Sequence, residues 1–117
     1  MNHPLFRDTI TLYKRRGEEY TRHVLRGVQW RQKIERAMSS QGVLQMQAVT
    51  SITIPADPHP AAVPEAGDVI ILGEGMEITD AYPVSALRAD HAGYCTVRAV
   101  SDNTLRPRLK HWKVYAV

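Results

Sequence analysis

The residues most able to do chemistry in this chain are five histidines, one cysteine and several acidic side chains in its middle. Zinc sites usually draw on histidines spaced four apart on a helix, or on closely spaced cysteine pairs. Neither spacing occurs, and no second cysteine accompanies Cys95, so the sequence favours neither a metal site nor a cofactor. The histidines are scattered along the chain, at His3, His23, His59, His91 and His111.

Nucleophile and phosphate-binding motifs are also missing from the sequence. There is no Gly-x-Ser-x-Gly and no Gly-x-x-x-x-Gly-Lys-Ser/Thr, and the run 73–75 (GEG) lacks the rest of a dinucleotide fingerprint. Cys95 alternates with Val97 and Ala99, which favours a buried small apolar residue over a nucleophile. The spacing of the carboxylates selects no acid–base pair. We therefore expect a protein that is not an enzyme.

Length and composition indicate one folded domain spanning residues 1–117. The chain is 44% hydrophobic and 23% charged, which is ordinary for a globular domain. No apolar run approaches the roughly 20 residues that a membrane span requires, and the first residues do not follow the plan of a signal peptide. A single cysteine fits a reducing compartment. We expect a soluble protein of the cytoplasm with no membrane partner.

Charge is segregated along the chain. Residues 1–36 carry a net charge of +5, residues 37–97 carry −6 and residues 98–117 carry +4, which together give the overall +3. Two explanations stay open. The ends can pair with the middle inside the fold, or opposite faces of the protein can carry opposite sign and favour head-to-tail assembly.

Alternating apolar residues predict strands over about 8–14, 20–33, 43–54, 68–73, 94–100 and 109–117. A helix is conceivable over 41–48, but the β-branched residues that follow favour a strand there. A short helix is expected over 81–90, capped by Thr79 or Asp80, with Pro83 in its first turn. Gly27 marks either a bulge within one long strand or a short loop between two strands.

The predicted strands do not alternate with helices as in βαβ units, so the sequence predicts an antiparallel barrel or sandwich. We expect a mainly β protein, a small antiparallel β-barrel of about six strands with one short helix and a long proline-rich loop. The last two strands should form a hairpin. The apolar residues expected in the core are Ile10, Leu12, Val28, Trp30, Ile70, Leu72, Val97 and Val114.

Two segments are candidate interaction sites. Residues 55–67 hold four of the seven prolines and cannot form a central strand, so they are expected to be a loop inserted in the barrel, with candidate contact residues Pro55, Asp57, His59, Pro60, Pro64 and Glu65. The basic final segment could be an edge strand that serves as an interface, or it could lie mid-sheet in its own barrel. Its candidate interface residues are Arg106, Arg108, Lys110, Trp112, Lys113 and Tyr115.

The stretches FRDTITLYKR, YTRHVLRGVQWRQKIE and VRAVSDNTLRPRLKHWKVYAV, at the two ends of the chain, resemble small structural proteins of tailed phages and Firmicute prophages. In these minor capsid, head-closure (stopper) or head–tail connector proteins, an early strand carries a D.IT.Y pattern. A later strand has an aromatic residue, here Trp30, and the last strand reads HW.V. The resemblance leaves the proline-rich centre uncovered.

The resemblance implies a viral structural protein of the virion neck, made in the host bacterial cytoplasm and assembled as a ring, expected to be a dodecamer. Its partners would be copies of itself, a portal or adaptor protein, a tail-completion or tail-tube protein, and double-stranded DNA passing without sequence specificity. The 55–67 loop would reach the channel or a neighbour, and its lack of lysine and arginine suits a lumen where DNA slides. Neighbours could add the final strand to their sheets.

Two other functions compete with this one. A small barrel of OB type could bind nucleic acid through its basic ends, although few aromatic residues alternate with the bases. A phage-encoded inhibitor of a host protein is the third hypothesis.

Overall fold

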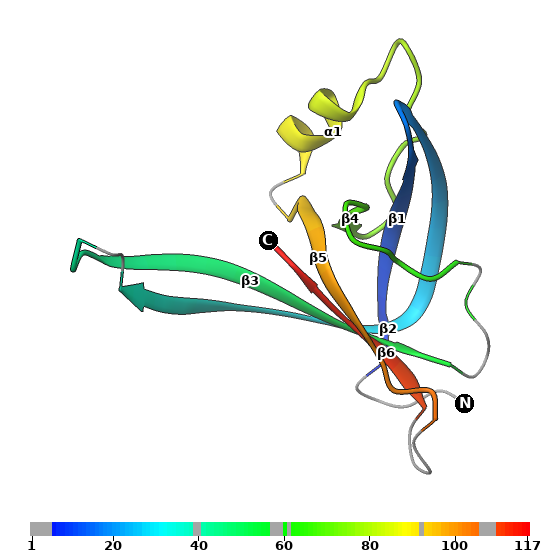
Figure 1. Ribbon diagram of the computed structural model, residues 1–117. Coiled ribbons are helices and arrows are strands. Elements are labelled where there is room, and N and C mark those ends of the chain that lie inside the picture. The colour runs from blue at the N-terminus through cyan, green and yellow to red at the C-terminus, as the bar shows by residue number, and fades with distance from the viewer. Residues whose placement is uncertain (1–5, 39–40, 57–59, 61, 92, 106–109) are drawn as a thin grey trace.

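The computed structural model describes residues 6–38, 41–56, 60, 62–91, 93–105 and 110–117, and in these residues six strands close into an antiparallel barrel (Figure 1). The order around the barrel is β1-β2-β3-β6-β5-β4, and every neighbouring pair is antiparallel. The expected small barrel with one short helix is confirmed. The elements are β1 (Asp8–Arg16), β2 (Glu19–Met38), β3 (Leu44–Pro55), β4 (Val69–Leu72), α1 (Val84–Asp90), β5 (Cys95–Asp102) and β6 (His111–Ala116).

The long strand β2 bends at Gly27 and serves two sides of the barrel. Asp8 pairs with Val28 and Thr9 pairs with Arg26, so Gly27 has no partner and forms a bulge. Its φ of 72° lies in the left-handed region, which glycine adopts without strain. Before the bulge β2 pairs with β1, and from Gln29 onward it pairs with β3. The bulge hypothesis is confirmed and the short loop is not.

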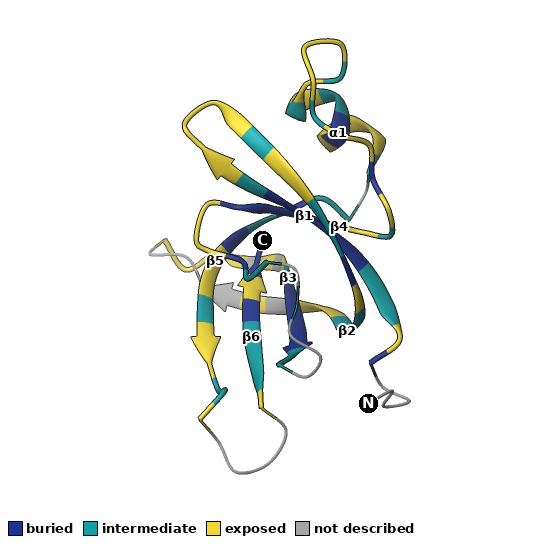
Figure 2. Cartoon of the chain, turned by 90° about the vertical axis from the view of Figure 1, so that its right-hand side faces the viewer, coloured by how far each residue is buried: buried dark blue, intermediate teal, exposed yellow. Residues whose placement is uncertain are grey.

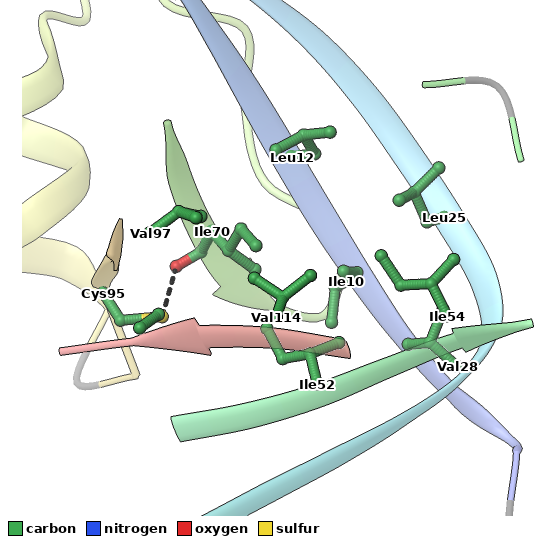
Figure 3. Packing of buried hydrophobic residues seen from close by; sticks show 11 residues of the cluster. Ile10, Leu12, Leu25, Val28, Ile52, Ile54, Ile70, Cys95, Val97 and Val114 are labelled. Atoms are coloured by element: carbon green, nitrogen blue, oxygen red, sulfur yellow. Dashed lines mark hydrogen bonds between the residues drawn. The ribbon is translucent and has the colours of Figure 1, made fainter. Parts of the chain in front are cut away.

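The barrel interior is filled by alternate apolar residues from all six strands (Figure 3). Six of the expected core residues are buried there, namely Ile10, Leu12, Val28, Ile70, Val97 and Val114. Trp30 is half-buried and packs against this cluster. The prediction that Leu72 lies in the core is wrong, because this residue is 47% exposed. It is the last residue of the short strand β4, and the chain turns at Gly73, whose φ is 86°.

A second apolar cluster lies outside the barrel, beneath α1. Tyr13, Val69, Ile71 and Leu87 are buried in it. The uninterrupted apolar run of β4 follows from this arrangement, because Ile70 belongs to the barrel cluster while its two neighbours belong to the cluster beneath α1. Figure 2 shows buried residues both in the barrel strands and in α1.

The helix begins later than expected. Pro83 is its N-cap, with φ −72° and ψ 167°, and no side chain caps it, so the predicted capping by Thr79 or Asp80 is wrong. The Thr79 hydroxyl instead accepts a hydrogen bond of 3.1 Å from the Tyr82 N–H, in a turn before the helix. Proline disfavours helical geometry in the residue before it, which delays the start.

The last strand lies in the middle of the sheet. β6 pairs with β3 on one side and with β5 on the other, and β5 with β6 forms the expected hairpin. Both backbone edges of β6 are therefore used within the chain. The hypothesis of a free terminal edge is wrong, and the mid-sheet alternative is the one observed.

Candidate interaction surfaces

The histidine, cysteine and acidic side chains that the structure describes do not gather into a metal-binding group. Among the described residues, no group of three or more histidine, cysteine, aspartate or glutamate side chains is placed to hold a metal ion. His23 lies on β2, His91 directly follows α1 and His111 begins β6. His3 and His59 lie outside the described residues. Two pockets and one exposed face are the other candidate functional sites.

Cys95 is a core residue, as its alternation predicted. It is 3% exposed, and its thiol donates a hydrogen bond of 3.4 Å to the carbonyl oxygen of Ile70 (Figure 3). Burial raises the pKa of the thiol to about 11. At neutral pH the sulfur is therefore protonated, and it packs as a small apolar group.

The most prominent surface belongs to a β-hairpin arm, which we define as residues 33–38 of β2 and 41–49 leading into and along β3. Figure 1 shows it extending away from the barrel. From the pair Lys33 and Val49 to the pair Met38 and Leu44, the two strands pair only with each other. The arm enlarges the molecule, whose radius of gyration is 15.2 Å, where a compact chain of similar length has about 13 Å.

One face of the arm is apolar and uncovered. Residues directly opposite in an antiparallel pair share a face. Ile34 lies opposite Ala48, and Arg36 lies opposite Met46. Ile34 is 64% exposed, Met46 is 63% exposed and Leu44 is 55% exposed. The uncovered face therefore combines large aliphatic side chains with one guanidinium group.

This apolar face continues the inner face of the barrel. The even-numbered residues of β3 point inward where the barrel is closed, and Ile52 and Ile54 are fully buried there. The same alternation carries Met46 and Leu44 onto the arm, beyond the last pairing with β6 at Thr50. The arm thus extends core-type surface into solvent.

An acidic groove lies at the other end of β2. It has a volume of about 510 Å³ and lies between the β1–β2 turn and the segment that enters α1. Three carboxylates and several apolar side chains line it, and no basic residue is among the described lining residues. They are Glu18, Glu19, Tyr20, Thr21, Ile78, Thr79, Asp80, Pro83 and Val84.

A cationic pocket of about 460 Å³ lies at the base of the arm. It is lined by Trp30, Arg31, Gln32, Lys33, Ser51 and Lys113. Arg31 pairs with Ser51 and Lys113 pairs with Thr53, so these residues share the sheet face opposite the apolar face of the arm. Of the expected interface residues in β6, Lys113 contributes to this pocket.

Residues 5–117 match the model of DUF6751, a family of unknown function. The chain belongs to this family. Comparison with curated proteins finds no match. The family match covers both ends and the proline-rich centre.

The other expected interface residues are dispersed. Trp112 packs against the barrel core, Tyr115 is 40% exposed, and Lys110 is exposed just before β6. Arg106 and Arg108 lie outside the described residues.

The later part of the proline-rich loop is fastened to the barrel. Lys14 donates a hydrogen bond of 2.7 Å to the Val63 carbonyl oxygen, and its ammonium lies 3.2 Å from a Glu65 oxygen and 3.6 Å from a buried Asp68 oxygen. Pro64 is buried. This part of the loop is therefore held against the barrel of the same chain.

The earlier loop positions contribute less to the described surface. Pro55 ends β3 and Pro60 is half-buried, whereas Asp57 and His59 lie outside the described residues. The described residues contain no helix with the length and hydrophobicity needed to cross a membrane.

Sequence reasoning missed the arm. The strand over 43–54 was expected, but the strand expected over 20–33 ends at 38 instead, so the first half of the arm was not predicted. Alternation over 43–54 only divides residues between two faces. One signal was present: Gly42 in a turn separates two alternating stretches that are longer than a small barrel wall needs.

Proposed function

We propose that this protein is a structural subunit of a tailed-phage virion neck, a head-closure or head–tail connector protein. It forms a ring between portal and tail, continues the DNA channel and can close it. The observation that carries the proposal is the arm, which extends apolar, core-type surface outside a finished barrel.

Such an arm suits a subunit that neighbours complete. A two-stranded hairpin is marginally stable in water when nothing packs on it. Exposed apolar patches of this kind commonly mark interaction sites. Ile34, Leu44 and Met46 gather on one face with no cover from the described parts of the chain. The resemblance of both chain ends to neck proteins supplies the biological context for such an assembly.

The segregation of charge also supports a ring. The apolar face of the arm bears the exposed Arg36, while the groove at the opposite end of β2 bears Glu18, Glu19 and Asp80. Unlike surfaces of opposite sign favour head-to-tail contacts, which close into rings when the rotation between subunits permits. The fastened part of the 55–67 loop gives no support to a loop reaching the channel, and the proposal does not depend on it.

Mixing the purified protein with the portal protein encoded beside it tests the proposal. Size-exclusion chromatography with light scattering should show a weakly associating monomer alone and a ring on the portal when the two are combined. Absence of a complex at micromolar concentrations would contradict the proposal. Portal or capsid genes upstream and tail genes downstream of the coding gene are expected as well.

The cationic pocket favours a second candidate, nucleic-acid binding. Arg31, Lys33 and Lys113 can contact phosphates at this pocket. The barrel has six strands in the described residues, whereas an OB-fold has five, which weakens the comparison with that fold.

Fluorescence anisotropy with labelled single-stranded DNA at several salt concentrations separates the two candidates. Nucleic-acid binding predicts affinity that falls steeply with salt, and a shallower slope for the double variant Arg31→Ala/Lys113→Ala. A neck subunit without this activity shows no binding that depends on these two residues.

A further inference from the structure

We propose that the apolar face of the arm docks into the acidic groove of a second copy of this chain. This inference rests on the proposed ring and names the two surfaces that build it. Ile34, Arg36 and Met46 supply the arm side. The groove between the β1–β2 turn and α1 supplies the other.

The first argument is chemical complementarity. The arm face presents large aliphatic side chains around a single exposed guanidinium group, that of Arg36. The groove presents an apolar floor, because Tyr20, Ile78 and Val84 pack onto the cluster beneath α1. Its exposed rim carries three carboxylates, from Glu18, Glu19 and Asp80. Each surface therefore offers what the other lacks.

The second argument is geometric, and it excludes docking within one chain. The groove touches β2 at Glu19, where the strand begins, and the arm holds its last residues up to Met38. Figure 1 shows the arm and α1 projecting from the barrel in different directions, well apart. An arm that fills this groove must therefore belong to another molecule.

The third argument concerns the type of assembly that follows. Arm and groove are different surfaces, so each copy can donate one arm and accept another. Such heterologous contacts repeat from copy to copy and close into a ring if the rotation allows. One strand, β2, would thus carry the donating and the accepting surface at its two ends.

A charge-reversal experiment tests the contact. In sedimentation velocity at a few hundred micromolar and low salt, the wild type should associate, and added salt should weaken the association. The arm variant Arg36→Glu and the groove variant Glu19→Arg/Asp80→Arg should each associate at least about tenfold more weakly than the wild type, because like charges then meet. Mixing these two variants should restore association, since both contacts become complementary again.

The matched control is Lys33→Glu. This variant changes the charge of the same arm by the same amount, but Lys33 lies on the opposite face, beside the cationic pocket. Its association should stay within about twofold of the wild type. All substituted side chains are exposed, so circular dichroism and thermal unfolding should confirm an unchanged fold.

Three results would overturn the inference: a wild type that stays monomeric, equal weakening by Lys33→Glu and Arg36→Glu, or a variant mixture that fails to associate. The outcome is separable from the proposed function. If Arg36→Glu still forms a ring on the portal as readily as the wild type, the neck function stands and this contact falls. If copies associate through arm and groove but no portal complex forms, the contact stands and the neck function falls.

Discussion

The carboxylate of Asp8 accepts a hydrogen bond of 2.9 Å from the backbone N–H of Trp30, across the place where β2 leaves β1 and begins to pair with β3. The Gly27 bulge lies immediately before this point. Together the two features fix the direction in which the second half of β2, and therefore the arm, departs from the barrel.

Replacing Asp8 with alanine should destabilise the fold. The Trp30 N–H is partly buried and would lose its acceptor, which lowers the free energy of unfolding by about 1–2 kcal/mol. Asp8→Asn keeps an acceptor oxygen and should lose less. Urea unfolding followed by tryptophan fluorescence measures both. Equal losses for the two variants would show that the hydrogen bond is not the cause.

Gly27→Ala should be destabilising through backbone strain alone. The residue has φ 72°, and a methyl group there would meet only the Phe6 carbonyl oxygen, at 3.7 Å. A residue with a Cβ in this conformation costs about 1 kcal/mol. Asparagine tolerates the left-handed region better, so Gly27→Asn should be the more stable variant in the same urea assay. The reverse order would argue against a strained bulge.

Gly75→Ala should be more damaging, because of crowding rather than strain. A Cβ at Gly75 would collide with the Tyr13 hydroxyl and with Ile71 Cδ1. The Tyr13 hydroxyl donates a hydrogen bond of 2.7 Å to the Met76 carbonyl oxygen, so it has little freedom to move away. Overpacking of this kind costs about 1–3 kcal/mol.

A double-mutant cycle with Tyr13→Phe identifies the collision. Removing the hydroxyl frees space for the new methyl group, so the double variant Gly75→Ala/Tyr13→Phe should lose less than the sum of the two single losses. Strict additivity of the unfolding free energies would place the damage elsewhere.

Most of the fold could be predicted because apolar and polar residues alternate locally along its strands. β1 shows this, since Ile10 and Leu12 face the core as expected. The same pattern could not show that Tyr13 on the other face would also be buried, because its cover comes from residues 73–76 and α1, far away in sequence. Leu72 was misplaced for a related reason: parity assigned it to the core, but the strand ends there.

The candidate surfaces were harder to predict, since exposure depends on which neighbours a strand finds. Met46 and Ile52 share a parity on β3, yet the first is 63% exposed and the second is fully buried. The difference arises because β6 pairs with β3 only from Thr50 onward. The acidic groove joins residues about 60 positions apart, and no local pattern connects them.

The ammonium group of Lys14 should control the later part of the proline-rich loop. It binds the Val63 carbonyl oxygen and lies near two carboxylates, so Lys14→Met, which keeps an apolar side chain but removes the charge, should free residues 62–67. We expect faster cleavage there in limited proteolysis and a stability loss of about 1–2 kcal/mol. Arg16→Met is the control, because Arg16 is exposed at the end of β1. Equal resistance to cleavage within residues 62–67 in both variants would show that Lys14 does not hold this part of the loop.

Stability should fall as pH rises from about 9 to 11 because of Cys95. Burial raises the pKa of its thiol from 9.0 to about 11 in the folded protein. In this window the unfolded chain loses the thiol proton while the folded chain keeps it. The unfolded state then binds fewer protons, so the free energy of unfolding decreases with pH, by roughly 2 kcal/mol over the window.

Comparison with Cys95→Ala isolates this effect, because burial also raises the pKa of Tyr13 and Tyr94, and both tyrosines contribute to the overall pH dependence in either protein. The difference in unfolding free energy between wild type and variant should be constant below pH 8.5 and should shrink toward pH 11, as the wild type loses the thiol's contribution. A difference that stays constant across the window would mean that the thiol ionises as readily in the folded barrel as in the unfolded chain. Thiol reagents give an independent check at pH 8, where the buried, protonated sulfur should react only as fast as the barrel opens.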